Sequence, residues 1–214
     1  MEITPKLVKD LRDRTGAGMM DCKRALEEAK GSLEEAEKVL RKQDKVKAAK
    51  KAGRAANQGC IHSYIHPGAR IGVLVEVNCE TDFAASSDEF QALAKDLAMH
   101  IAAADPRFIA RDEVTQAIID SEREIYRAQV QAMGKPPQVV DKIVEGKMTS
   151  FFSEACLLDQ PFVKDTAMPV KARIEATIAK IGENVQVRRF ARFKLGEEAA
   201  TIAVAKPLAE DAAN

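Results

Sequence analysis

Residues 71–78 have the sequence IGVLVEVN, in which a branched apolar residue returns at every second position. This period of two predicts a β-strand whose apolar face is made by Ile71, Val73, Val75 and Val77. Residues 60–66 alternate in the same way. Between the two runs, His66-Pro67-Gly68-Ala69 places Pro and Gly as a type II turn prefers. We therefore expect an antiparallel β-hairpin with one buried face.

Further elements are predicted on the C-terminal side of the hairpin. Ser86-x-x-Glu89 is a capping box, and the helix after it carries apolar residues at core spacing from Phe90 to Ile101. Residues 185–193 read as a last strand that joins the hairpin. Other helices are expected over about 112–132, after Pro136-Pro137, through 151–155, and over 170–181 up to Gly182.

The first fifty residues predict three short helices. Thr4-Pro5 begins the first, residues 19–30 form the second, and the capping box Ser32-x-x-Glu35 begins the third. Helices of this length must pack together to persist. We expect a helical domain over residues 1–52, an α+β core with a small antiparallel sheet packed with helices over 53–196, and a flexible tail over 197–214.

Composition excludes several classes of protein. The 214 residues include 33 Lys+Arg and 33 Asp+Glu, no Trp and 5% aromatics, which argues against a general nucleic-acid binder. No apolar run is long enough to span a membrane, and no signal peptide is visible. Four cysteines without a C-x-x-C pair predict reduced thiols in a cytoplasmic protein.

The zero net charge conceals an asymmetry, because residues 1–58 carry +5 and the remainder carries −5. Residues 38–54 contain eight basic residues and a single acid, Asp44. A charged helix or solvated linker explains this run. The alternative is a surface that binds RNA, the ribosome or another partner.

No motif for a metal, a cofactor or a bound nucleotide is found. Cys60, His62 and His66 share one side of a strand, but residues 62 and 66 would lie about 13 Å apart, too far for one ion. The phosphate-loop and dinucleotide patterns are absent. Glu76, Glu80 and Asp82 could form a carboxylate cluster for a metal-dependent hydrolase, but the sequence shows no base to accompany them.

The junction Glu80-Thr81-Asp82-Phe83 has two structural interpretations. Phe83 could be a hydrophobic staple that packs against the following helix. It could instead be an exposed apolar wedge with a charge beside it, which is a typical arrangement for contacting a partner. The residue types alone do not choose between them.

Four segments resemble motifs of the elongation factor Ts family, in the family's order. They are LRDRTGAGMMDCKRAL at 11–26, KAAKK at 47–51, EVNCETDF at 76–83 and GENVQVRR at 182–189. The resemblance covers about residues 1–196.

The resemblance implies a guanine-nucleotide exchange factor for elongation factor Tu that acts without catalysing a chemical reaction and without a cofactor. Its N-terminal helices would be ubiquitin-associated-like and dock on the GTPase. By position, Asp82, Phe83, Ala84 and Ala85 would form the wedge that displaces Mg²⁺ from the partner. The implied docking residues are Arg12, Met19, Met20, Lys23, Lys51 and His66. Because two consecutive methionines cannot both face inward, one exposed Met is expected.

Two departures from the family pattern matter. Ala84 stands where many relatives have Val. The chain also has one sheet core, whereas longer relatives have two related core halves and a coiled-coil insertion. Short relatives compensate by pairing, so we expect a twofold homodimer. Phe190, Phe193 and the apolar face of the hairpin are the expected contacts.

Overall fold

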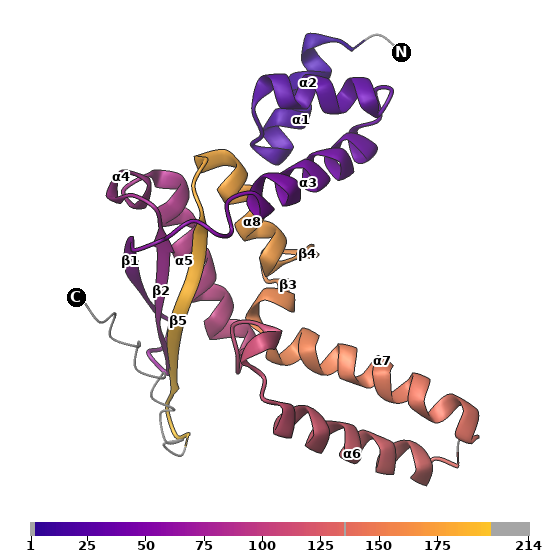
Figure 1. The fold of residues 1–214 in the computed structure, drawn as a ribbon. Coiled ribbons are helices and arrows are strands. Elements are labelled where there is room, and N and C mark those ends of the chain that lie inside the picture. Colours follow the sequence, from indigo (N-terminus) through magenta and orange to yellow (C-terminus); the bar gives the residue numbers. More distant parts are fainter. Residues whose placement is uncertain (1–2, 135, 198–214) are drawn as a thin grey trace, which may run out of the picture.

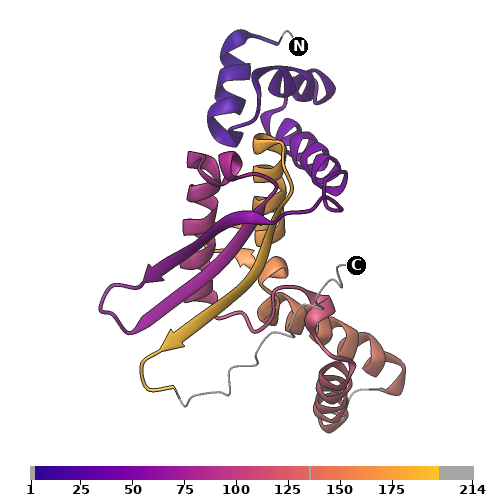
Figure 2. The ribbon, with the colours of Figure 1, turned by 60° about the vertical axis from the view of Figure 1, so that its left-hand side comes forward.

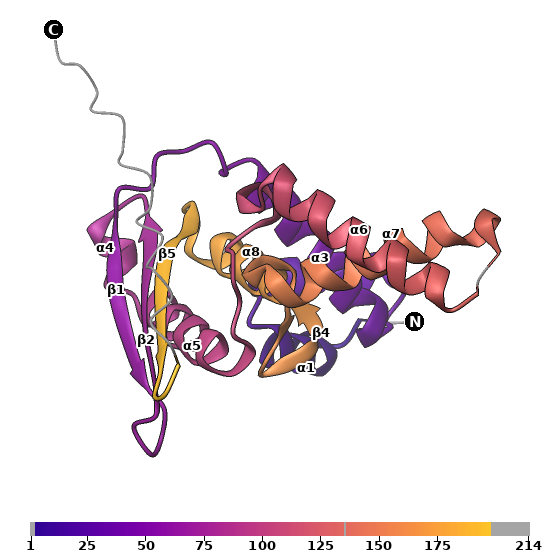
Figure 3. The same cartoon turned by 90° about the horizontal axis from the view of Figure 1, so that it is seen from below.

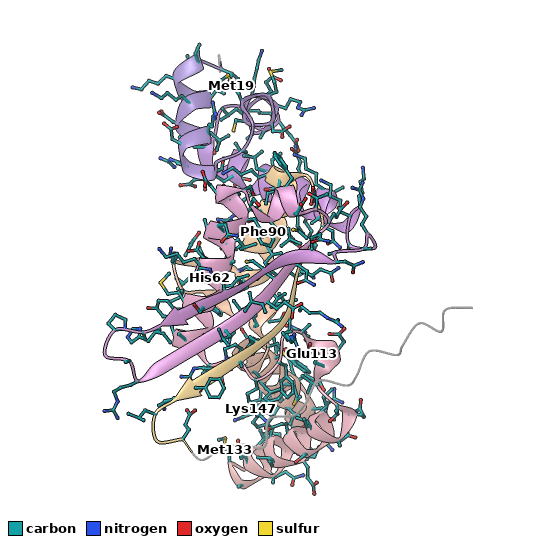
Figure 4. All side chains as sticks on the ribbon, turned by 90° about the vertical axis from the view of Figure 1, so that its left-hand side faces the viewer. Met19, His62, Phe90, Glu113, Met133 and Lys147 are labelled. Carbon is teal, nitrogen blue, oxygen red and sulfur yellow. The ribbon has the colours of Figure 1, made fainter. Side chains whose placement is uncertain are left out.

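The structure is a computed structural model that describes residues 3–134 and 136–197. It has three parts (Figure 1): three N-terminal helices at one end, a sheet covered by helices in the middle, and a projecting pair of helices at the other end. Figure 4 shows Met19 and Met133 at these opposite ends. The fold is α+β, as predicted.

The N-terminal part consists of α1 (Pro5–Thr15), α2 (Met19–Glu28) and α3 (Leu33–Ala49). The predicted caps are confirmed: Thr4 Oγ1 accepts a hydrogen bond from the Leu7 N–H at 3.3 Å, and Ser32 Oγ accepts one from the Glu35 N–H at 3.4 Å. The three helices share a small core of their own. Helix α3 continues beyond this core and packs on α8 (Val170–Ile181), so that Ala48 belongs to the central core.

The central sheet has the order β1-β2-β5, with both pairs antiparallel. Its strands are β1 (Gln58–Ile65), β2 (Ile71–Cys79) and β5 (Val185–Lys194). The predicted turn is confirmed, because Gly68 has φ +88° and the Ala69 N–H donates to the His66 carbonyl at 2.9 Å. The third strand joins the hairpin as expected.

One face of the sheet is covered and the other is open (Figure 3). Helices α5 (Asp88–Ala104) and α8 cover the face of Val73, Val75 and Val77, which are at most 2% exposed. Among the described residues no helix covers the opposite face, which we call the outer face. Its large apolar side chains are exposed by 48–66%: Ile61, Ile65, Leu74 and Phe193.

The projecting part is an antiparallel hairpin of α6 (Gln116–Ala132) and α7 (Pro137–Ala155), with a separate core that includes Val130, Val144 and Met148. Two sequence expectations were wrong here. Helix α7 is one continuous helix instead of two, and the chain does have a projecting helical hairpin, which had been expected only in longer relatives.

Smaller corrections concern the ends of elements. Ser87, and not Ser86, caps α5, since Ser87 Oγ accepts from the Phe90 N–H at 3.3 Å. Ser86 instead ends the short helix α4 (Asp82–Ala85). The second helix ends at Glu28, two residues early. Four elements had no signal in the sequence: the 3₁₀ turns at 111–113 and 157–159, and the strands β3 (Pro161–Phe162) and β4 (Asp165–Pro169).

The expected flexible tail lies outside the described residues, apart from its first residue. Within the part of the chain that the structure describes, no helix is long and apolar enough to cross a membrane.

Candidate functional site

The strand-to-helix junction presents Phe83 to solvent. Thr81 is the N-cap of α4, and its Oγ1 accepts a hydrogen bond from the Ala84 N–H at 3.2 Å. Phe83 is 86% exposed, and Asp82 beside it is also exposed. A hydrophobic staple would bury the ring, so the structure excludes the staple interpretation of Phe83.

Ala84 and Ala85 lie beneath this exposed pair. They are 2% and 8% exposed and belong to the central core. They anchor the short helix instead of lying on its surface. The difference between Ala and Val at position 84 therefore concerns packing under the wedge and not its outer shape.

The junction is bonded to the loop between α8 and β5. Both carboxylate oxygens of Glu183 accept hydrogen bonds from Thr81, at 3.0 Å from its backbone N–H and at 2.7 Å from its hydroxyl. The Cys79 thiol donates to the Thr81 carbonyl at 3.1 Å. Burial raises the pKa of Cys79, so its thiol stays protonated and able to donate.

The three carboxylates of the hydrolase interpretation do not form a cluster. Glu76 binds Arg189, with 2.6 Å between Oε2 and Nε, and Glu80 accepts from the Asn184 N–H at 2.6 Å. Across residues 3–134 and 136–197, no group of three or more His, Cys, Asp or Glu side chains could hold a metal ion.

A groove in the N-terminal part brings together four of the predicted docking residues. It has a volume of about 530 Å³ between α1 and α2. Met19 and Met20 are 59% and 65% exposed, so both methionines face out where one had been expected. Ile3, Pro5 and Val8 add apolar surface, and charged residues surround it. The charged lining residues are Lys9, Arg12, Asp13 and Lys23.

Lys51 and His66 lie elsewhere. Lys51 is half-buried beside the α8–β5 loop, and burial, followed by the neighbouring Arg54, lowers its pKa. His66 is in the β1–β2 turn, where its Nδ1 lies 3.2 Å from the Tyr64 hydroxyl. Figure 2 shows this turn at the opposite end of the sheet from α4. Nine residues of β2 separate the two ends, a distance of about 30 Å.

The basic stretch 38–54 is partly used inside the molecule. Lys47 binds Asp21 at 2.9 Å and so joins α3 to α2, and this hydrogen bond lowers the pKa of Asp21. Lys38 pairs with Glu35, and Arg54 pairs with Glu80. These pairs favour the interpretation of residues 38–54 as a charged helix and linker over their interpretation as a binding surface. The remaining basic side chains include three beside a groove of about 330 Å³ that Lys171 also lines: Arg41, Lys42 and Lys45.

Sequence reasoning missed Glu183 and Asn184 as site residues. Both were inside a motif named above, but their partners lie far away in the chain: Glu183 binds Thr81, 102 residues earlier, and Asn184 binds Glu80, 104 residues earlier. A signal was available: two polar residues directly after a helix-ending glycine and directly before a buried strand must find partners.

Comparisons with known proteins agree with the motifs. The family profile described as "Elongation factor TS" matches residues 22–176. The elongation factor Ts of Carboxydothermus hydrogenoformans is 58% identical over 195 residues, which is 91% of this chain and 90% of its own. That of Solibacter usitatus is 56% identical over 92% of each chain. That of Koribacter versatilis is 52% identical over 96% of this chain and 94% of its own.

Proposed function

This chain belongs to the elongation factor Ts family, and from that premise we propose that it is a guanine-nucleotide exchange factor for the GTPase elongation factor Tu in translation elongation. It binds the GDP form of elongation factor Tu and promotes release of GDP, so that GTP can bind. No covalent bond is made or broken in this process, so the protein acts by binding and not as an enzyme.

The observation that carries the proposal is the exposed Phe83 on a rigid base. A large apolar side chain that is 86% exposed gains free energy when a partner buries it. Asp82 adds a negative charge beside the ring. Such a pair is suited to entering the GTPase next to its Mg²⁺ and phosphate loop, where GDP depends on the metal ion and on backbone N–H donors.

Exchange follows from competition for the same partner. If insertion of the wedge displaces Mg²⁺ or turns N–H groups away from the β-phosphate, GDP binds more weakly while the factor is bound. The coupling is reciprocal, so GDP must weaken the factor to the same extent. Each ~1.4 kcal/mol of coupling corresponds to a tenfold change in affinity.

The groove between α1 and α2 supplies the second contact in this proposal. Flexible methionine side chains adapt to an apolar partner surface, and Arg12 and Lys23 flank them to fix orientation. Lys51 contributes to the contact from beside the α8–β5 loop, where it is half-buried.

The test is release of a fluorescent GDP analogue from elongation factor Tu. The wild-type protein should accelerate release. Phe83→Ala should lose about 1.5–3 kcal/mol of insertion energy, and thus roughly 10- to 150-fold in exchange efficiency. Met133→Ala is a matched control, because Met133 is also exposed, by 62%, but lies on the helical hairpin. No acceleration by wild type would refute the function, and equal acceleration by Phe83→Ala would refute the site.

We also propose that the chain forms a twofold homodimer through the outer face of the sheet. Four large apolar side chains are exposed together there, and a twofold contact would bury all four on each of the two subunits. Of the expected contacts, Phe193 lies on this face. Phe190 packs on the central core, and the apolar face of the hairpin is covered by α5 and α8, so neither of these is available. If the sheets pair with their strands antiparallel, the β1–β2 turn with His66 comes near the partner subunit's wedge.

Light scattering after size-exclusion chromatography tests the dimer. Leu74→Lys puts a charge in the middle of the outer face, where Leu74 is 48% exposed, and should give a monomer. Met133→Lys places the same charge on the hairpin and should leave the dimer intact. A monomeric wild-type protein would overturn this proposal.

A second candidate function is RNA or ribosome binding by the basic stretch. It is favoured by the groove that Arg41, Lys42, Lys45 and Lys171 line together. Phosphate contacts make affinity fall steeply with salt. Binding to ribosomal RNA measured between 50 and 200 mM salt would support it if the affinity dropped by roughly tenfold or more, and absence of binding at 50 mM would reject it.

A further inference from the structure

Two neighbouring residues of the α8–β5 loop bind two different segments of the chain: Glu183 binds Thr81, directly before the wedge, and Asn184 binds the linker that follows the N-terminal helices. We propose that Glu183 and Asn184 are positioning residues: Glu183 fixes the wedge, and Asn184 fixes the linker that leads from the N-terminal helices. The loop thereby sets the placement of one docking surface relative to the other. This inference rests on the proposed exchange function.

Glu183 acts on the residue directly before the wedge. Its two oxygens hold the Thr81 N–H and hydroxyl, at 3.0 Å and 2.7 Å. Because the hydroxyl proton is donated to Glu183, the hydroxyl lone pairs are free to accept the Ala84 N–H at 3.2 Å. Donating to a carboxylate makes that hydroxyl a better acceptor. Helix α4 has only four residues and cannot persist alone, so this chain of bonds fixes its first turn.

Asn184 acts on the linker. Its side chain is nearly fully buried, and its Nδ2 donates to the Arg54 carbonyl at 2.7 Å and to the Ala52 carbonyl at 3.5 Å. Its backbone N–H donates to Glu80 at 2.6 Å, next to Thr81. Residues 52–54 join α3 to β1, so this residue ties the exit of the N-terminal helices to the end of β2.

The arrangement points to positioning more than to stability. The bonds between Glu183 and Thr81 are exposed, and exposed polar contacts add little to the free energy of folding. They nevertheless determine the direction of the only turn that carries Asp82 and Phe83. A change at Glu183 should therefore alter exchange far more than it alters unfolding.

The first test compares Glu183→Ala with Asp159→Asn. Asp159 also binds its partner, Arg111, through two hydrogen bonds, at 2.9 and 3.0 Å, but lies at the base of the helical hairpin. Glu183→Ala should lower kcat for GDP release about tenfold with KM changed less than about twofold, since the wedge is displaced while the docking groove is intact. Glu183→Gln keeps one acceptor and should recover part of kcat. Asp159→Asn should leave both constants unchanged.

Asn184→Ala should change KM more than kcat, which is the reverse of the effect expected for Glu183→Ala. The linker is released while Thr81 stays bonded to Glu183, so KM should rise about tenfold with a smaller change in kcat. A variant at Thr81 provides a further check: Thr81→Val removes the hydroxyl hydrogen bond to Glu183 but keeps the backbone one, so the loss in the double variant with Glu183→Ala should be smaller than the sum of the two single losses. Additive losses in that cycle would contradict a shared action on the wedge.

Hydrogen exchange at residues 82–86, measured without elongation factor Tu, separates this inference from the proposed function. The Ala84 N–H should exchange faster in Glu183→Ala than in wild type, with the thermal midpoint nearly unchanged. Unchanged protection of these amides overturns the positioning role. Faster amide exchange in Glu183→Ala, together with a wild-type protein that fails to release GDP, rejects the exchange function and leaves the positioning of the turn intact.

Discussion

His100 is a buried histidine whose two ring nitrogens have fixed roles, so it predicts how stability depends on pH. Its side chain is fully buried in α5. Nδ1 accepts a hydrogen bond from the Val163 N–H at 3.1 Å, so the proton must reside on Nε2, which lies 2.9 Å from Gln160 Oε1. The Gln160 amide in turn donates to the Glu154 carbonyl at 2.6 Å. If Nδ1 were protonated, its N–H would face the Val163 N–H, and two hydrogen-bond donors would be left without an acceptor between them.

The sign and the size of the effect follow from this geometry. Burial lowers the pKa of His100 in the folded protein, whereas the unfolded chain has the ordinary value near 6.5. The unfolded state therefore binds more protons below pH 6.5, and the free energy of unfolding falls as the pH decreases. Between pH 7 and pH 5 a single such histidine contributes a loss of at most about 2 kcal/mol.

Urea unfolding at pH 5.0, 5.5, 6.0, 6.5 and 7.0 measures this slope. His100→Asn keeps an acceptor at the position of Nδ1 but does not titrate, so it should be less stable at pH 7 by about 1–3 kcal/mol and have a flatter profile. Parallel profiles for wild type and His100→Asn would refute the reasoning.

Four further predictions use thermal or chemical unfolding and thiol labelling. Gly59→Ala should destabilise by more than about 2 kcal/mol, because φ is +144° and a Cβ would lie 2.1 Å from the Val77 carbonyl oxygen; a loss below 0.5 kcal/mol would contradict it. Phe90→Ala should cost about 3–5 kcal/mol, since the ring is fully buried in the central core. Gly146→Ala should stabilise by about 0.5–1 kcal/mol, because a methyl group at this helical position meets no atom within 4 Å; a lower urea midpoint would count against it. Cys156, whose pKa burial raises to about 11, should stay unlabelled by a thiol reagent at pH 8 until the protein unfolds.

The elements that the sequence predicted correctly are those with a local signal. The hairpin follows from alternation along β2 and from a turn whose Pro and Gly have fixed conformational preferences. The caps at Thr4 and Ser32 depend on residues three positions apart. Helix α7 was divided wrongly because its pattern of apolar residues is set by packing on α6, which a local reading does not contain.

The site was predictable only in part, for the same reason. The motif located Asp82 and Phe83, but the direction of the Phe83 ring depends on whether the core leaves space for it. Ala84 and Ala85 fill that space. The contact between Glu183 and Thr81 joins residues 102 positions apart, and no local period reports such a pair.

The pairing of β2 with β5 also has a consequence for synthesis on the ribosome. Glu76 binds Arg189, which follows it by 113 residues, so the sheet stays incomplete until nearly the whole described chain has been made. Helices α1–α3 can fold early on their own core. The hairpin β1–β2 leaves the ribosome before β5 has been made, so β2 is then paired only with β1. The long-range pairing of β2 with β5 is slow. During translation the exposed edge of β2 is the segment most at risk of pairing with a neighbouring nascent chain.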